Sequence, residues 1–227
     1  VGNTPPLSGQ AAAIDFKEIA LLSNGETNNA ILLPEGSDIK SVKDLEGKKV
    51  AVAKGSSAFG LLYAAFEKEG VDPSKVDVIQ LQPDEAQPAF ENNSVDAWAT
   101  WEPFISYQTV GNNATALLKG KDVGTYGAMF TIARTAFTEQ NPDLVATYLE
   151  VYQKATKWMK ENPKEAVQFF ADLKGINPAT VEEILKNTPY ELQVINDKVI
   201  ASQQSAADLF VEQGVFSNKI DVTKVVD

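Results

Sequence analysis

The sequence of 227 residues contains no cysteine and no histidine. The absence of cysteine excludes disulfide bonds, a thiolate nucleophile, iron–sulfur clusters and cysteine-ligated zinc. The absence of histidine excludes a Ser-His-Asp triad, the HExxH zinc motif and acid–base catalysis by imidazole. These two absences remove many common catalytic centres and favour a binding function.

Basic residues are also scarce, because 20 Lys and Arg stand against 31 Asp and Glu, for a formal net charge of −11. Arg134 is the only arginine. A nucleic-acid-binding surface needs clustered basic residues, so this function is disfavoured. No apolar run approaches the roughly 20 residues of a membrane span. The first residues show neither a signal peptide nor a lipidation cysteine. A cysteine-free composition suits an extracytoplasmic protein, but it is only weak evidence for that location.

Short apolar runs alternate with helical patterns in the first half of the chain, which predicts an α/β fold with a parallel sheet of βαβ units. The clearest helix follows the KKVAVA run, carries Phe59, Leu62 and Phe66 on one face, and ends at Gly70. After Arg134 the pattern becomes mainly helical. The strands are expected at 16–22, 29–33, 48–53, 76–81, 96–101, 114–118 and 128–133, and further helices at 4–13, 84–92, 142–162, 164–174, 178–186 and 197–213.

The segment Lys54-Gly55-Ser56-Ser57 lies between a predicted strand and this helix. The first backbone N–H groups of a helix lack internal acceptors, and the helix dipole adds partial positive charge there. Ser56 and Ser57 could therefore complete an anion site. A plain helix cap explains the same serines, because Ser is favoured at helix starts in any protein, and on the segment alone this simpler explanation is preferred.

A second segment, DAWATWEPF, places aromatic side chains and a carboxylate at the end of a predicted strand. Ligands of open parallel sheets collect at that edge. Core packing is the better explanation for Trp98, whereas Trp101 and Glu102 are expected to line a binding cleft. A carboxylate near an anion site is unfavourable unless it orients a hydrogen-bond donor or reads a cationic group of the ligand, so Glu102 is expected to do one or the other. Asn3 and Thr4 form another strand-to-helix corner that could face an anion, although a simple turn explains it as well.

The order of these segments resembles the substrate-binding proteins of bacterial ABC importers for aliphatic sulfonates, taurine and nitrate. The resemblance rests on SDIKSVKDLEGKKVAVAKGSSAFGLLYAAFEKEG, then LQPDEAQPAFENNSVDAWATWEPF, with VGNTPPLSGQAA at the start. It covers nearly the whole chain, and the C-terminal helices are the least distinctive part.

The resemblance implies a type II periplasmic-binding-protein fold, in which two α/β lobes are joined by two crossing segments and a ligand binds in the cleft between them. Lobe I would comprise 1–35 with 133–227, lobe II would comprise 38–125, and the crossings would lie near 33–37 and 126–132. The ligand-binding residues would be Ser56, Ser57, Trp101 and Glu102, faced by Asn3 and Thr4 of lobe I, with Phe130 and Thr131 of the second crossing as further candidates.

Members of the family usually have a strand, a helix and another strand before the VGNTPP segment. Lobe I is therefore expected to be N-terminally incomplete, and an incomplete lobe is expected to expose a strand edge and apolar surface. The chain is therefore expected to associate with another copy of itself through lobe I. The second lobe is expected to be intact from Lys48 to Leu118.

The function implied is capture of a small organic anion, an aliphatic sulfonate or taurine, for an ABC importer with a permease partner. No enzyme activity, cofactor or metal is expected. The location is expected to be periplasmic or extracellular, with lipoprotein anchoring of the full-length form. The alternatives are a binding protein for nitrate or another small anion, an enzyme of the pyrimidine-synthesis type and a sensory module on the same fold.

Overall fold

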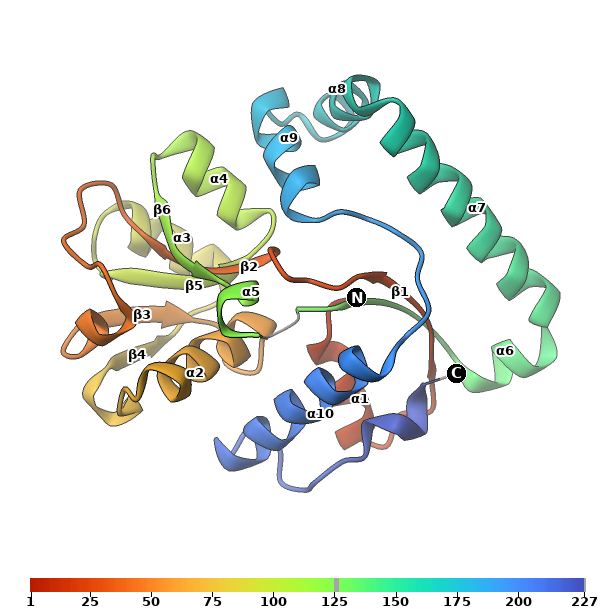
Figure 1. Cartoon of the computed structure of the whole chain (residues 1–227), viewed down its shortest axis with the longest axis horizontal. Coiled ribbons are helices and arrows are strands. Elements are labelled where there is room, and N and C mark those ends of the chain that lie inside the picture. The colour runs from red at the N-terminus through yellow and green to blue at the C-terminus, as the bar shows by residue number, and fades with distance from the viewer. Residues whose placement is uncertain (125–126, 227) are drawn as a thin grey trace. The chain divides into compact units, whose positions relative to one another are not determined.

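The computed structural model describes residues 1–124 and 127–226. The chain divides into two compact units. Unit 1 consists of Val1–Asn24 and the chain from Ala128 onward, and unit 2 is the continuous segment Gly25–Gly127 (Figure 1). Each unit is described by itself below.

Unit 2 is built on a five-stranded sheet in the order β4-β3-β5-β2-β6. The strands β3, β4 and β5 pair in parallel, as the βαβ pattern predicts. The strand β2 is antiparallel to β5 and to β6, so the expectation of an all-parallel sheet was wrong for this strand. The βαβ pattern comprises β3, β4 and β5 and does not constrain the direction of a strand that precedes them in the sequence. The bounds are β2 Asn29–Leu33, β3 Lys49–Val52, β4 Asp77–Gln80, β5 Ala97–Trp101 and β6 Thr115–Lys119.

Helices cover the sheet of unit 2 on both faces, with α2 on one side and α3 and α4 on the other (Figure 1). On the side of α3 and α4, Trp98 is 1% exposed and packs against Phe90 and Phe104, which confirms its predicted place in the core. The bounds of the helices are α2 Ser57–Glu69, α3 Pro83–Glu91, α4 Phe104–Gly111 and α5 Gly120–Val123, with 3-10 turns η1 at Val42–Leu45 and η2 at Pro73–Lys75.

Unit 1 has a two-stranded antiparallel sheet of β1, Lys17–Ser23, and β7, Met129–Ala133. The backbone N–H of Phe130 donates to the carbonyl of Val1, so the first residues continue the pairing along β7. Several helices surround this sheet, and three of them begin with proline, as their sequences predict. Their bounds are α1 Thr4–Ala11, α6 Thr135–Gln140, α7 Pro142–Glu161, α8 Pro163–Lys174, α9 Pro178–Asn187 and α10 Asp197–Glu212, followed by the 3-10 turn η3 at Val222–Val225.

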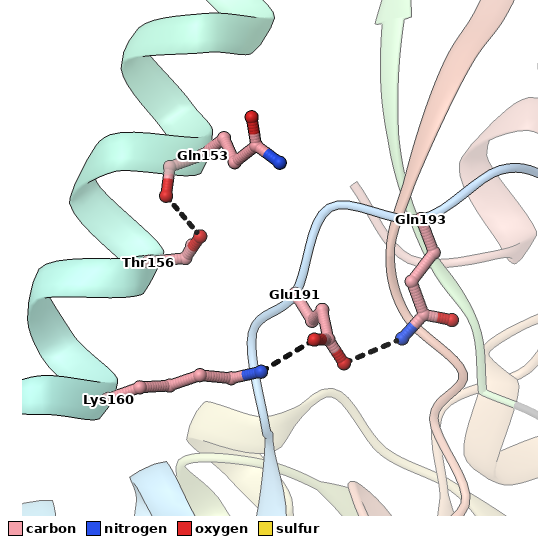
Figure 2. Close-up of polar contacts among 5 residues, drawn as sticks. All are labelled: Gln153, Thr156, Lys160, Glu191 and Gln193. Atoms are coloured by element: carbon pink, nitrogen blue, oxygen red, sulfur yellow. Dashed lines mark hydrogen bonds and ion pairs between the residues drawn. The ribbon is translucent and has the colours of Figure 1, made fainter.

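The segment between α9 and α10 forms hydrogen bonds with β1 and an ion pair with α7. The backbone N–H of Gln193 donates to the carbonyl of Leu21 at 2.8 Å, and its side-chain Nε2 donates to Glu191 at 3.3 Å. Figure 2 shows that Lys160 of α7 reaches the same Glu191 carboxylate, with an Nζ–Oε1 distance of 2.6 Å. Both members of this ion pair are about half exposed, so its stabilising contribution is small.

The observed boundaries of the units differ from the expected lobes. The strand β2 lies in unit 2 because it pairs with β5 and β6, so the first part of unit 1 ends at Asn24, before the expected limit of 35 and the expected crossing at 33–37. The second boundary lies at Gly127–Ala128, within the expected crossing at 126–132. Residue 125, the expected end of lobe II, and residue 126 lie outside the described residues.

Candidate functional site

The turn from β3 into α2 places Ser56 and Ser57 at a helix start, as predicted. Gly55 has a φ of 73°, a left-handed conformation that glycine adopts without strain. Ser56 is the N-cap of α2, and its Oγ accepts a hydrogen bond from the backbone N–H of Phe59 at 3.1 Å. This bond is the one that the simpler explanation, a plain helix cap, predicts for Ser56.

Ser57 is connected to the sheet. Its Oγ donates to Oδ1 of Asn29 at 2.7 Å. Asn29 is the first residue of β2, is 2% exposed, and lies opposite Trp101 of β5 in the strand register. Within unit 2, Asn29 therefore links Ser57 to the end of β5 that carries Trp101.

The same asparagine continues a chain of buried amides. Asn29 Nδ2 donates to Asn28 Oδ1 at 2.9 Å, and Asn28 Nδ2 donates to the carbonyl of Gly127 at 3.0 Å. A Cβ on Gly127 would lie 1.7 Å from Asn29 Nδ2, so a larger residue would displace this amide. The sequence reasoning missed Asn28, Asn29 and Gly127. The available signal was an asparagine pair directly before an apolar strand, because buried amides require partners.

Trp101 is the last residue of β5, Glu102 follows it in a turn, and both are partly buried. The ring of Trp101 meets Phe104 edge to face, with centroids 5.9 Å apart. The backbone N–H of Glu102 donates to the carbonyl of Asn28 at 3.0 Å. Its carboxylate accepts hydrogen bonds from the backbone N–H of Ser106 at 3.2 Å and from the Ser106 hydroxyl at 2.9 Å. These bonds direct the carboxylate to the first turn of α4 and supply a structural role that the sequence reasoning did not consider.

The remaining predicted residues lie in unit 1. Asn3 and Thr4 are both buried at the start of α1, and the Thr4 hydroxyl lies 3.5 Å from Asn3 Oδ1. Thr131 is partly buried, and its hydroxyl oxygen is buried without a hydrogen-bond partner among the described residues. Phe130 is fully buried in a cluster with Leu21, so its geometry is that of a core residue rather than of an accessible ligand contact.

The predicted residues thus form two sets, one in each unit. Two cavities lie elsewhere. One of about 590 Å³ is open to the surface and lined by α7, α8, α9 and residues 188–190, and one of about 410 Å³ lies between residues 34–35, α3 and α4. Neither is lined by a predicted site residue. Within the described parts of the chain, no group of three or more Asp and Glu side chains is arranged to hold a metal ion.

One titratable group has a strongly altered environment. Glu18 of β1 is fully buried, and this burial raises the pKa of its carboxyl group to about 7, while a hydrogen bond from Gln203 Nε2 at 2.6 Å opposes the shift. Its second oxygen has no hydrogen-bond partner among the described residues. Glu18 belongs to unit 1 and is not one of the predicted site residues.

Comparisons with known proteins place this architecture among binding proteins. The model of the NMT1/THI5-like family matches residues 7–166. A Bacillus subtilis relative, whose name gives aliphatic sulfonates as its ligands, is 46% identical over 227 residues, which are all of this chain and 68% of the relative.

Two solved structures are also similar over the whole of this chain. One is the periplasmic aliphatic sulphonate binding protein SsuA from Escherichia coli, with a TM-score of 0.93, 29% identity and 74% of that protein covered. The other is the alkanesulfonate-binding protein SsuA from Xanthomonas axonopodis pv. citri bound to MOPS, with a TM-score of 0.89, 30% identity and 78% covered. The predicted periplasmic-binding-protein fold is confirmed, and this chain belongs to the NMT1/THI5-like family.

Proposed function

We propose that this protein captures a small organic anion, an aliphatic sulfonate, as the solute-binding component of an ABC importer. The observation that carries this proposal is the 46% identity, over every residue of the chain, to a relative whose name gives aliphatic sulfonates as its ligands. The aligned region covers all of this chain and therefore both units.

The geometry of unit 2 supports an anion at the start of α2. This helix has 13 residues, and the N–H of Phe59 in its first turn already donates to the Ser56 cap. The N–H groups that precede Phe59 lack an acceptor within the helix, so they offer hydrogen bonds and partial positive charge to a sulfonate. Trp101 offers an apolar aromatic surface to an alkyl tail. An alkanesulfonate needs an anion site and an apolar wall. Asn29 of β2 bonds Ser57 and lies opposite Trp101, which supports the proposal that both lie in one site.

We also propose that the protein acts outside the cytoplasm, delivers its ligand to a permease, and is not an enzyme. The similar SsuA proteins support this proposal, since both are named as binding proteins and the one from Escherichia coli as periplasmic. No helix in the described part of the chain combines the length and the apolar character needed to cross a membrane. Lipoprotein anchoring of a longer form remains a prediction.

Isothermal titration calorimetry on the whole chain tests the proposed ligand class. Ethanesulfonate and butanesulfonate are expected to bind. In a thermal-shift measurement at equal concentrations, the tighter ligand is expected to raise the melting temperature more, because a ligand of the folded state stabilises it. Nitrate, acetate and sulfate serve as controls for anion charge alone. Tight binding of nitrate with no binding of either sulfonate would contradict the proposal and favour the nitrate alternative.

A further inference from the structure

The hydrogen-bond chain Gly127–Asn28–Asn29–Ser57 has a fixed direction. The carbonyl oxygen of Gly127 can only accept, so Asn28 must use its Nδ2 to reach it. Asn28 then presents Oδ1 to Asn29, which must donate with its own Nδ2. Asn29 consequently presents Oδ1 to Ser57, and the single hydroxyl proton of Ser57 must be the donor in that bond.

Burial and close packing hold this series of hydrogen bonds in place. Asn28 and Asn29 are 7% and 2% exposed, so reversing either amide would leave buried polar groups without partners, at a cost that favours the arrangement found. Gly127 allows the close approach of the amides, because any Cβ at that position would overlap Asn29 Nδ2.

From this direction we infer that Asn29 is a positioning residue that makes Ser57 a hydrogen-bond acceptor toward the ligand. While its proton is held by Asn29, Ser57 offers only lone pairs to other groups. Those lone pairs repel a sulfonate oxygen and attract an N–H or O–H group. The inference rests on the proposed function and refines the initial expectation that Ser57 holds the anionic group itself.

The ligand class that follows is a sulfonate that carries a hydrogen-bond donor, such as a hydroxyalkanesulfonate or an aminoalkanesulfonate. The sulfonate would be bound by the backbone N–H groups of α2, and the donor would be bound by Ser57 Oγ. A matched pair of probes isolates this effect, because ethanesulfonate and 2-hydroxyethanesulfonate carry the same charge and differ in one hydroxyl group.

Calorimetry with both probes on the whole chain gives a selectivity ratio for each variant. The wild-type protein is expected to bind 2-hydroxyethanesulfonate about fivefold more tightly than ethanesulfonate, as one added hydrogen bond predicts. Ser57→Ala should bring the ratio close to one. Asn29→Ala should also lower the ratio, because it frees the Ser57 proton to donate to the sulfonate, and in the Ser57→Ala background it should have no further effect on the ratio.

Gly127→Ala provides a second route to the same test if Asn29→Ala fails to fold. It should displace the Asn29 amide and lower the ratio, whereas Gly111→Ala, where an added Cβ meets nothing within 4 Å, should leave the ratio unchanged. A merely structural role of Asn29 would weaken both probes equally and leave the wild-type ratio intact, which would overturn the inference. Failure of the wild-type protein to bind either probe would overturn the proposed function as well, and so differs from a failure of the inference alone.

Discussion

Glu18 has a carboxyl group whose burial should be visible in the pH dependence of stability. Its pKa is about 7 in the folded state, above the ordinary value of 4.5, so the folded state holds this proton more strongly than the unfolded state does. Between these two values the unfolded chain binds fewer protons, and the free energy of unfolding therefore falls as the pH rises. The loss is complete above about pH 7 and amounts to roughly 3 kcal/mol.

We expect Glu18→Gln to remove this decline, because an amide does not titrate in that range. The measurement is the free energy of unfolding in urea at several values between pH 4.5 and 8. The exposed Glu161→Gln is a matched control that should keep the wild-type slope. An unchanged slope in the Glu18 variant would show that its carboxyl group is not the source of the dependence.

Glu102 gives a second prediction at the scale of one residue. Because its carboxylate accepts two hydrogen bonds from Ser106, Glu102→Gln should lower the free energy of unfolding by about 1 kcal/mol. The relative affinities for taurine and ethanesulfonate should change little if this carboxylate is fully occupied at α4. Chemical denaturation and calorimetry check the two parts. A large loss of preference for taurine would restore the role in reading a ligand cation that was expected from the sequence.

At the scale of one element, variants of Ser56 at the start of α2 can separate its role as the helix N-cap from its proposed role in ligand binding. Ser56→Ala should cost about 1 kcal/mol of stability, because the N–H of Phe59 loses its acceptor. Ser56→Asp should keep the cap, since aspartate is an equally good N-cap, but should weaken sulfonate binding through repulsion between like charges. Denaturation and titration of both variants are the measurements. Undiminished sulfonate binding by the aspartate variant would place the anion away from this helix.

The secondary structure could be predicted from the sequence wherever a short apolar run or a long helical period was clear. The run at 29–33 coincides with β2, and the expected helix at 142–162 agrees with α7 to within one residue at its end. The short helices α5 and α6 were missed, because four and six residues cannot display a helical period clearly. The direction of β2 could not be predicted either, because strand direction depends on which strands pair.

The candidate site was predictable only in part. The turn at Ser56 and Ser57 has a local signature, since a strand, a glycine and serines precede an amphipathic helix. The asparagine pair at Asn28 and Asn29 indicates amides that need hydrogen-bond partners, but the sequence does not identify those partners. Ser57 and Gly127 reach the pair through pairing and packing across separations of 28 residues and more in the sequence. For Glu102, the residue type suggested a ligand contact, whereas the hydrogen bonds to Ser106 depend on where the helix α4 begins, two residues later.

At the scale of the whole molecule, α7 carries an exposed apolar stripe. Leu144, Tyr148, Val151 and Trp158 lie on one face of the helix and are 41–58% exposed, and α8 adds Phe169 and Leu173. Apolar surface of this kind favours association. We therefore expect the chain to self-associate through unit 1 as its concentration rises.

Light scattering across a concentration series measures this association. Val151→Glu should shift the chain toward the monomer, because it places a charge within the stripe. Gln153→Glu introduces the same charge on the opposite face of α7 and should have little effect. A wild-type chain that stays monomeric at every concentration would contradict the expectation.

In the sequence, unit 2 lies between the two parts of unit 1, and this order has a consequence for synthesis on the ribosome. The strand β1 emerges before unit 2, but its partner β7 emerges only after all of unit 2 has been made. Unit 2 has its five strands in one continuous segment and can close its sheet as soon as β6 is available. Since pairing between distant segments is slow and must wait for both strands, β1 remains without β7 throughout this interval. Unit 2, in the middle of the sequence, can therefore fold on the ribosome before unit 1, which contains the N-terminal segment.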